Sequence, residues 1–265
     1  MAAGQQSIDV RLTTFAFGGE CIGRLADGRA VFVPYGLPGE LVRVQLTEQK
    51  ANFARGRLVD VIQPAAERIQ PRCRHYGICG GCHYQHMSYD TQLRAKRSIL
   101  MDQLSRIAGL DGIPVKEVIP SPANWNYRNS VQFHLDSQGW HGFQKRGSNE
   151  LVQISECFLP EPALDALWRQ LEFEPEMGIE RIELRCGAEE ELMVVLETSG
   201  FELPEFSVDM PLSAVHLSPA GEIVLAGDDH LMMMVDGQPF RVSAQSFFQV
   251  NTAQASAMVA YLLEK

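Results

Sequence analysis

The first 65 residues alternate apolar and polar side chains in short runs, which is the pattern of strands with one buried face. Ile8, Val10 and Leu12 begin this pattern. Asp27-Gly28 stands between two short apolar runs and is typical of a tight β-hairpin turn. Five such strands with close turns predict a small closed barrel, and the oligonucleotide-binding barrel is one fold of this kind. A barrel with a purely structural role is the alternative.

A helical pattern replaces this alternation between residues 88 and 110. Leu93, Leu100, Leu104 and Ile107 fall on one side of a helix at their spacing, which predicts a helix with an apolar stripe. Glycines and a proline follow Ile107 and end the pattern.

The centre of the chain returns to strand-like patterns. These runs lie at residues 131–135, 140–144, 151–154, 181–197, 215–217, 223–225 and 231–235. Residues 160–171 and 252–265 read as two further helices. We therefore predict an α+β fold whose central sheet is antiparallel.

The net charge of −10 argues by itself against a nucleic-acid partner, but the charge is unevenly spread. Residues 1–160 carry 18 basic and 14 acidic side chains, whereas residues 161–265 carry 5 and 19. A local basic face can bind phosphate on an acidic protein, because salt screens charges beyond about 8–10 Å. A solvated surface without a partner is the alternative. The basic residues near the cysteines are Arg68, Arg72, Arg74, Arg94, Lys96, Arg97 and Arg106.

No apolar run is long enough to span a bilayer, and the first residues lack the layout of a signal peptide. We expect a cytoplasmic protein with no membrane partner. In that compartment, clustered cysteines are more typical of metal binding or catalysis than of disulfides.

Four cysteines carry the strongest chemical signal. Cys73, Cys79 and Cys82 lie in one glycine-rich run, and Cys157 lies far along the chain. Four-cysteine zinc sites usually present two Cys-x-x-Cys pairs, whereas this chain has one such pair. Iron–sulfur clusters often take three thiolates from one loop and one from a distant position. The spacing favours an iron–sulfur cluster, with a zinc site and unliganded cysteines as the alternatives.

The other candidate residues carry weaker signals. His75, His83 and His86 could replace a cysteine ligand, although each is more typical of a surface or hydrogen-bonding histidine. Cys21 and Cys186 lie in strand-like runs and are expected to pack as small apolar side chains. The sequence contains no glycine-rich phosphate loop and no evident Ser/His/Asp arrangement. It therefore shows a cluster site and binding surfaces but no catalytic machinery.

Four stretches resemble one known family. They are Val31–Glu40, Cys73–His86, Gly142–Cys157 and Phe247–Asn251. The chain resembles the N-terminal and central parts of bacterial RNA uracil-5 methyltransferases, and within them the 23S rRNA class with a TRAM domain and a [4Fe-4S] cluster. The resemblance covers nearly the whole chain.

The resemblance implies roles for particular residues. Cys73, Cys79, Cys82 and Cys157 would hold the [4Fe-4S] cluster, and Gln249 would contact S-adenosylmethionine. Phe247 would lie near the target RNA bases; without the family, it and Gln249 read as core packing and helix capping. Arg128 is a further candidate RNA contact, together with two neighbouring aromatic residues, Trp125 and Tyr127, for which packing in the core is the favoured alternative. RNA, and 23S rRNA in particular, is the expected partner, and no DNA partner is expected.

The resemblance also implies a domain organisation. It predicts a TRAM-like oligonucleotide-binding barrel at 1–65, an iron–sulfur α+β domain at 66–240, and the start of a Rossmann-like methyltransferase domain at 241–265. The helix at 88–110 would pack with the catalytic domain, so that part of its apolar stripe would be exposed in this chain or covered by a second copy of it.

In this family a cysteine adds to C6 of uracil so that C5 can accept the methyl group, and the target base must leave its stack. The nucleophilic cysteine, the acidic base and the glycine-rich cofactor turn lie in the C-terminal domain, and we find none of them here. We expect a truncated chain that has no catalytic residue and does not methylate RNA by itself. A non-catalytic RNA-binding or assembly module with a structural cluster is the alternative, and an iron–sulfur electron carrier is a third reading.

Overall fold

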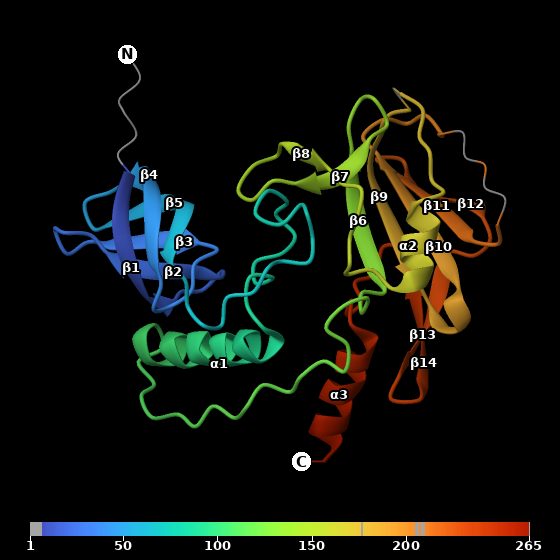
Figure 1. Cartoon of the computed structure of the whole chain (residues 1–265). Helices are drawn as coiled ribbons and strands as arrows, with labels where there is room; N and C mark the ends of the chain where they lie inside the picture. The colour runs from blue at the N-terminus through green and yellow to red at the C-terminus, as the bar shows by residue number, and fades with distance from the viewer. Residues whose placement is uncertain (1–6, 176, 205–206, 208–209, 265) are drawn as a thin grey trace. The chain divides into compact units, whose positions relative to one another are not determined.

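A computed structural model describes residues 7–264 except 176, 205–206 and 208–209 (Figure 1). The described residues form two compact units. The first contains the chain up to Gly77 together with Gly81–Pro120, and the second contains Ile78–Gly80 and the chain from Ser121 onward. No helix of the described residues has the length and apolar character needed to cross a membrane.

The first unit contains the predicted five-stranded barrel. Its strands are β1 (Ser7–Phe15), β2 (Glu20–Arg24), β3 (Ala30–Pro34), β4 (Leu41–Gln49) and β5 (Phe53–Gln63), and they close in the order β1-β2-β3-β5-β4. Alternate side chains fill the interior, among them Val10, Val33 and Val44. Gly28 takes a φ of 87° in the turn between β2 and β3, which is the conformation that the Asp-Gly signal predicts.

Helix α1 (Tyr89–Arg106) follows in the same unit. The Ser88 hydroxyl caps it by accepting from the Thr91 backbone N–H. Thr91 and Ala95 are its buried residues, and Ala95 packs with Leu37 of the barrel. Short side chains on this face let the helix lie close to the barrel. Part of the predicted apolar stripe is exposed, as expected, because Leu100 is 48% exposed.

The second unit is built on a seven-stranded sheet in the order β12-β11-β10-β9-β6-β7-β8 (Figure 1). The strands are β6 (Ser130–Leu135), β7 (His141–Gln144), β8 (Leu151–Gln153), β9 (Ile179–Cys186), β10 (Leu192–Thr198), β11 (Ser213–Ser218) and β12 (Gly221–Ala226). A short 3₁₀ helix, η1 (Ala188–Glu190), joins β9 to β10, and helix α2 (Pro162–Trp168) packs against β9. Phe133 and Trp168 meet edge to face in this core.

The prediction of an antiparallel sheet is wrong at one pair of strands. β10 and β11 run parallel, with Val195 opposite Val215, so the sheet is mixed. The reason is the long connection between Thr198 and Ser213, since a parallel pair needs such a crossover whereas a hairpin would make the pair antiparallel.

Two further strands and a helix complete the second unit. Strands β13 (His230–Val235) and β14 (Gln238–Ser243) form a separate two-stranded sheet, and helix α3 (Thr252–Leu263) packs against β13. The sequence does not predict β14, because its first four residues, Gln238–Arg241, are exposed and show no apolar alternation. The predicted domain ranges 1–65, 66–240 and 241–265 differ from these packing units and stay a prediction.

Candidate functional site

Two of the six cysteines are core residues, as predicted. Cys21 is fully buried in β2 and Cys186 is 3% exposed in β9. Burial raises the pKa of the Cys21 thiol far above its ordinary range and raises the pKa of Cys186 to about 12. Both side chains therefore stay protonated at neutral pH, and neither is a nucleophile.

The four predicted cluster ligands lie outside regular helices and strands. Cys73, Cys79, Cys82 and Cys157 are all thiols and are all half-buried. Cys73 and Cys82 belong to the first unit, whereas Cys79 and Cys157 belong to the second. The described residues contain no group of three or more His, Cys, Asp or Glu side chains that could hold a metal ion.

A buried ion pair fixes the chain that leads into the cysteines. Glu40 is fully buried and accepts hydrogen bonds from Arg68 Nε (2.5 Å) and Nη2 (2.8 Å). The backbone N–H groups of Leu37 and Ala65 also donate to this carboxylate. Burial pushes the pKa of Glu40 upward, but these donors outweigh it and hold the pKa below its ordinary value. The Arg68 guanidinium is thus engaged by Glu40 inside the first unit. Of the seven basic residues near the cysteines, Arg68 therefore has a structural role, and the phosphate-binding face stays a prediction.

His86 connects the same segment to the barrel. Its ring lies 2.5 Å from Tyr76 Oη through Nδ1 and 3.2 Å from the Gly36 carbonyl through Nε2. Burial lowers the pKa of His86 to about 4, so the ring is neutral at physiological pH. In the neutral form, Nε2–H donates to the Gly36 carbonyl, which leaves Nδ1 as an acceptor for the Tyr76 hydroxyl. The same hydroxyl also lies 2.8 Å from the His83 carbonyl, so its single proton is shared between the two acceptors. Both nitrogens are therefore engaged, which is the hydrogen-bonding role expected for this histidine and not that of a metal ligand.

We call the first-unit residues Cys73–Gly77 and Gly81–Met87 the cysteine loop. Within it, the Gln85 side chain accepts from the backbone N–H of Cys73 (3.1 Å). Gly19, in the turn between β1 and β2, has a φ of 80°, and a Cβ there would lie 3.1 Å from His83 Cβ. The barrel turn and the cysteine loop therefore meet where only glycine fits.

Cys79 lies beside the end of β7 in the second unit. The Gly80 N–H donates to the Gln144 carbonyl (2.9 Å), and Cys79 forms an isolated antiparallel bridge with Lys145. A Cβ on Gly80 would lie 2.8 Å from the same carbonyl, so this close approach requires glycine.

The residues Ser243–Asn251, here called the presenting segment, carry the predicted cofactor and RNA contacts. Phe247 is 82% exposed and Gln249 is exposed, so the core-packing alternative for Phe247 is wrong. Asn251 caps α3, because its Oδ1 accepts from the Gln254 N–H. The capping alternative for Gln249 is therefore wrong too.

Arg128 and its aromatic neighbour Trp125 lie in the chain that enters β6. The backbone of Arg128 pairs with Leu159 and Glu161, and its Nε is buried without a hydrogen-bond partner among the described residues. Trp125 is half-buried and meets Phe158 edge to face, with ring centroids 6.2 Å apart. The RNA contact of Arg128 stays a prediction.

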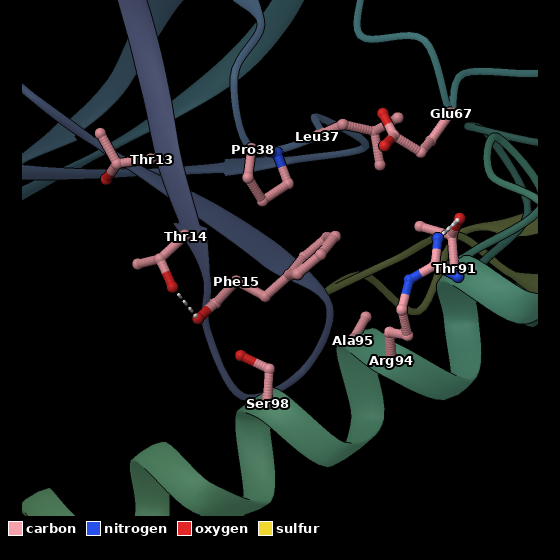
Figure 2. Close-up of a pocket in the computed structure, with 10 residues that line it drawn as sticks. All are labelled: Thr13, Thr14, Phe15, Leu37, Pro38, Glu67, Thr91, Arg94, Ala95 and Ser98. Carbon is pink, nitrogen blue, oxygen red and sulfur yellow. Dashed lines mark hydrogen bonds between the residues drawn. The ribbon is translucent and has the colours of Figure 1, made fainter. Parts of the chain in front are cut away.

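Figure 2 shows an open groove of about 320 Å³ in the first unit, between β1 and the first turns of α1. Apolar side chains, Phe15 among them, lie beside hydroxyl groups. Arg94 donates to the Thr91 hydroxyl (2.9 Å) and forms no ion pair within the described residues. The groove was not predicted, because its two walls are far apart in sequence. It is lined by Thr13, Thr14, Phe15, Leu37, Pro38, Glu67, Thr91, Arg94, Ala95 and Ser98.

Comparisons with known proteins agree with this architecture. Residues 5–59 match the TRAM domain model. An uncharacterized RNA methyltransferase of Thermosynechococcus vestitus is 31% identical over 99% of this chain and 66% of its own length. One of Halalkalibacterium halodurans is 29% identical over 90% of this chain and 60% of its own length. The chain thus spans slightly less than two thirds of these relatives.

A solved structure shares the fold. It is the Pyrococcus abyssi tRNA (uracil-54, C5)-methyltransferase in complex with S-adenosyl-L-homocysteine, with a TM-score of 0.69 over 96% of this chain and 64% of that protein. The two sequences are 23% identical, so this likeness concerns the fold alone. The barrel of the first unit is accordingly a TRAM domain, and the chain is related along nearly its whole length to proteins named RNA methyltransferases.

Proposed function

We propose that this chain is the RNA-binding and cofactor-contacting part of an S-adenosylmethionine-dependent RNA uracil-5 methyltransferase, with 23S rRNA as its substrate. The observation that carries the proposal is a TRAM barrel followed by a second unit that is similar to RNA methyltransferases throughout. The likeness of Cys73–His86 and Phe247–Asn251 to the uracil-5 family supports the narrower assignment.

The presenting segment is the proposed meeting point of cofactor and RNA. Gln249 contacts S-adenosylmethionine, and Phe247 offers its ring to a base that has left its stack. An exposed aromatic ring suits this role, because unstacked RNA bases are held by stacking on such rings. The high exposure of Phe247 supports the assignment.

We place the RNA contact of the first unit at the groove in Figure 2. Apolar side chains beside hydroxyls suit a nucleoside. The guanidinium of Arg94, which lines the groove together with the Glu67 carboxylate and forms no ion pair within the described residues, suits a phosphate.

The iron–sulfur cluster belongs to this proposal as well. Four half-buried thiols in irregular segments match the donor chemistry of a [4Fe-4S] cluster, and the two remaining cysteines are buried in strands. Cys73, Cys79, Cys82 and Cys157 would hold it, and when bound it would supply a structural brace for the central domain. The described residues alone do not assemble a metal site.

We further infer that the 265 residues bind RNA without methylating it. Methyl transfer to C5 of uracil needs a thiolate nucleophile. The two cysteines outside the proposed cluster are buried, and burial raises the pKa of each.

The test is binding of a fluorescein-labelled 23S rRNA stem-loop at increasing salt. We expect the affinity to fall steeply with salt, because phosphate contacts release counterions. Arg94→Gln should weaken binding several-fold and reduce the salt slope by about one. Lys96→Gln removes the same charge from an exposed residue outside the groove and should change affinity less. Absent or salt-independent binding would contradict the proposed function.

A further inference from the structure

We infer that Asn129 and Arg185 are positioning residues that hold the presenting segment in the form that exposes Phe247 and Gln249. The inference rests on the proposed function, in which these two side chains meet RNA and cofactor. Both positioning residues are buried, at 2% and 8% exposure, and neither is accessible to a large ligand.

Arg185 anchors the first half of the presenting segment. Its Nη1 donates to the carbonyls of Ser243 (3.1 Å) and Ser246 (3.0 Å). Its Nε and Nη2 donate to the two carboxylate oxygens of Glu183, which neutralises the guanidinium. One edge of the planar guanidinium is thus bound to Glu183 of the sheet, and its other nitrogen binds the backbone of the presenting segment. Lysine cannot reproduce this arrangement, because it has no planar fork of donors.

Asn129 anchors the second half. Its Nδ2 donates to the Gln249 carbonyl (2.9 Å) and to the Thr252 hydroxyl (2.8 Å), and its backbone N–H donates to the Val250 carbonyl (2.9 Å). Its own carbonyl accepts from the backbone N–H of Cys186. Through its backbone carbonyl and its side-chain amide together, Asn129 therefore connects β9 to the backbone of Gln249.

The two anchors bracket Phe247. Arg185 holds residue 246 and Asn129 holds residue 249, while the side chain of Phe248, between them, packs against the buried core beside β13. Phe247 consequently faces solvent although burial of its ring would be favourable. Buried hydrogen bonds that keep an aromatic ring exposed lower the ordering cost of a later stacking contact.

A purely structural role for the anchors makes a different prediction. If they only stabilised the fold, their loss would weaken RNA binding independently of Phe247, and the two effects would add. If they act by placing Phe247, their loss should matter little once the ring has been removed.

The experiment is a double-mutant cycle on binding of a fluorescein-labelled single-stranded oligouridylate. Phe247→Ala and Asn129→Ala should each weaken binding about tenfold, which corresponds to the loss of one or two good contacts. The double variant should bind no more weakly than the weaker single variant. Arg185→Lys provides a second test, because it keeps the charge and removes the fork.

Arg181→Lys is the matched control, since Arg181 lies on the same strand and pairs with Glu197 instead. Its affinity should equal that of the unmodified chain. Amide hydrogen exchange in Ser243–Asn251 should accelerate in Asn129→Ala and Arg185→Lys but not in Arg181→Lys.

The outcomes separate the two proposals. If the unmodified chain binds no RNA, the proposed function fails. If Phe247→Ala weakens binding while Asn129→Ala and Arg185→Lys do not, or if the effects in the cycle add, the positioning role is overturned and RNA binding stands.

Discussion

The cysteine loop and the presenting segment are both irregular, but different kinds of polar group hold them in place. Each is an irregular stretch held against its own unit by buried polar groups. The cysteine loop depends on groups that titrate, namely the Glu40–Arg68 pair and the neutral ring of His86. The presenting segment depends on donors from Asn129 and Arg185 to backbone carbonyls. Fixation of the first should respond to pH through the neutral ring of His86, whereas fixation of the second should respond to the donor geometry of Asn129 and of Arg185, which is paired with Glu183.

The largest expected difference between the two segments is in metal content, because only the cysteine loop carries proposed cluster ligands. If the cysteine loop serves as a ligand loop, anaerobically purified protein should be brown and contain iron and acid-labile sulfide in near-equal amounts. Cys82→Ser removes one of the four proposed thiolates and should abolish most of the bound iron. Cys21→Ala, a buried core cysteine, should retain it. Colourless protein that contains zinc would contradict the cluster.

The next largest effect is expected at the buried ion pair. Glu40→Gln leaves Arg68 with an uncompensated charge, and we expect the free energy of unfolding to fall by about 3–5 kcal/mol. Chemical denaturation measures this change. Glu48→Gln is the control, because Glu48 pairs with Lys50 and Arg55 at the exposed surface and should contribute about 0–1 kcal/mol. Equal effects of the two substitutions would show that the pair does not fix the loop.

A pH titration separates the two kinds of anchor. The folded-state pKa of His86 is about 4 against an ordinary 6.5, so the unfolded chain binds the proton first as pH falls. The free energy of unfolding should therefore decrease from pH 6.5 toward pH 4, by about 3 kcal/mol in full. Below that range, protonation of Glu40, whose pKa is also lowered, removes further stability.

The measurement is the unfolding free energy against pH for the unmodified chain and for His86→Gln. The variant should show a flatter profile between pH 6.5 and 4, because the ring that resists protonation is absent. Parallel profiles would exclude His86 as the source of the acid sensitivity.

The smallest expected effect concerns the end of the presenting segment. Asn251→Ala removes the cap of α3 and should lower the free energy of unfolding by about 1 kcal/mol. Asn251→Asp keeps the accepting oxygen and should lose less, although it gives up the hydrogen bond to Ser121. Thermal unfolding of the three proteins distinguishes them. If aspartate were as harmful as alanine, the contact with Ser121 would outweigh the cap.

Features set by local pattern could be predicted from the sequence, and features set by long-range pairing could not. Alternation and the positive φ that Gly28 supplies located the barrel strands and their hairpin. Charge and spacing show that Arg68 lies near the cysteines, but they do not show that it pairs with the buried Glu40, which lies 28 residues away. The anchors of the presenting segment could not be predicted either, because Asn129 lies 120 residues from Gln249 in the sequence.

The contact of Gly19 with His83 has a consequence for building chimaeric proteins. A TRAM barrel transplanted from another protein would have to carry glycine at this turn, because any larger side chain would push against the cysteine loop. The barrel therefore cannot be exchanged between proteins independently of the cysteine loop. Its sequence and that of the loop should change together when such proteins diverge.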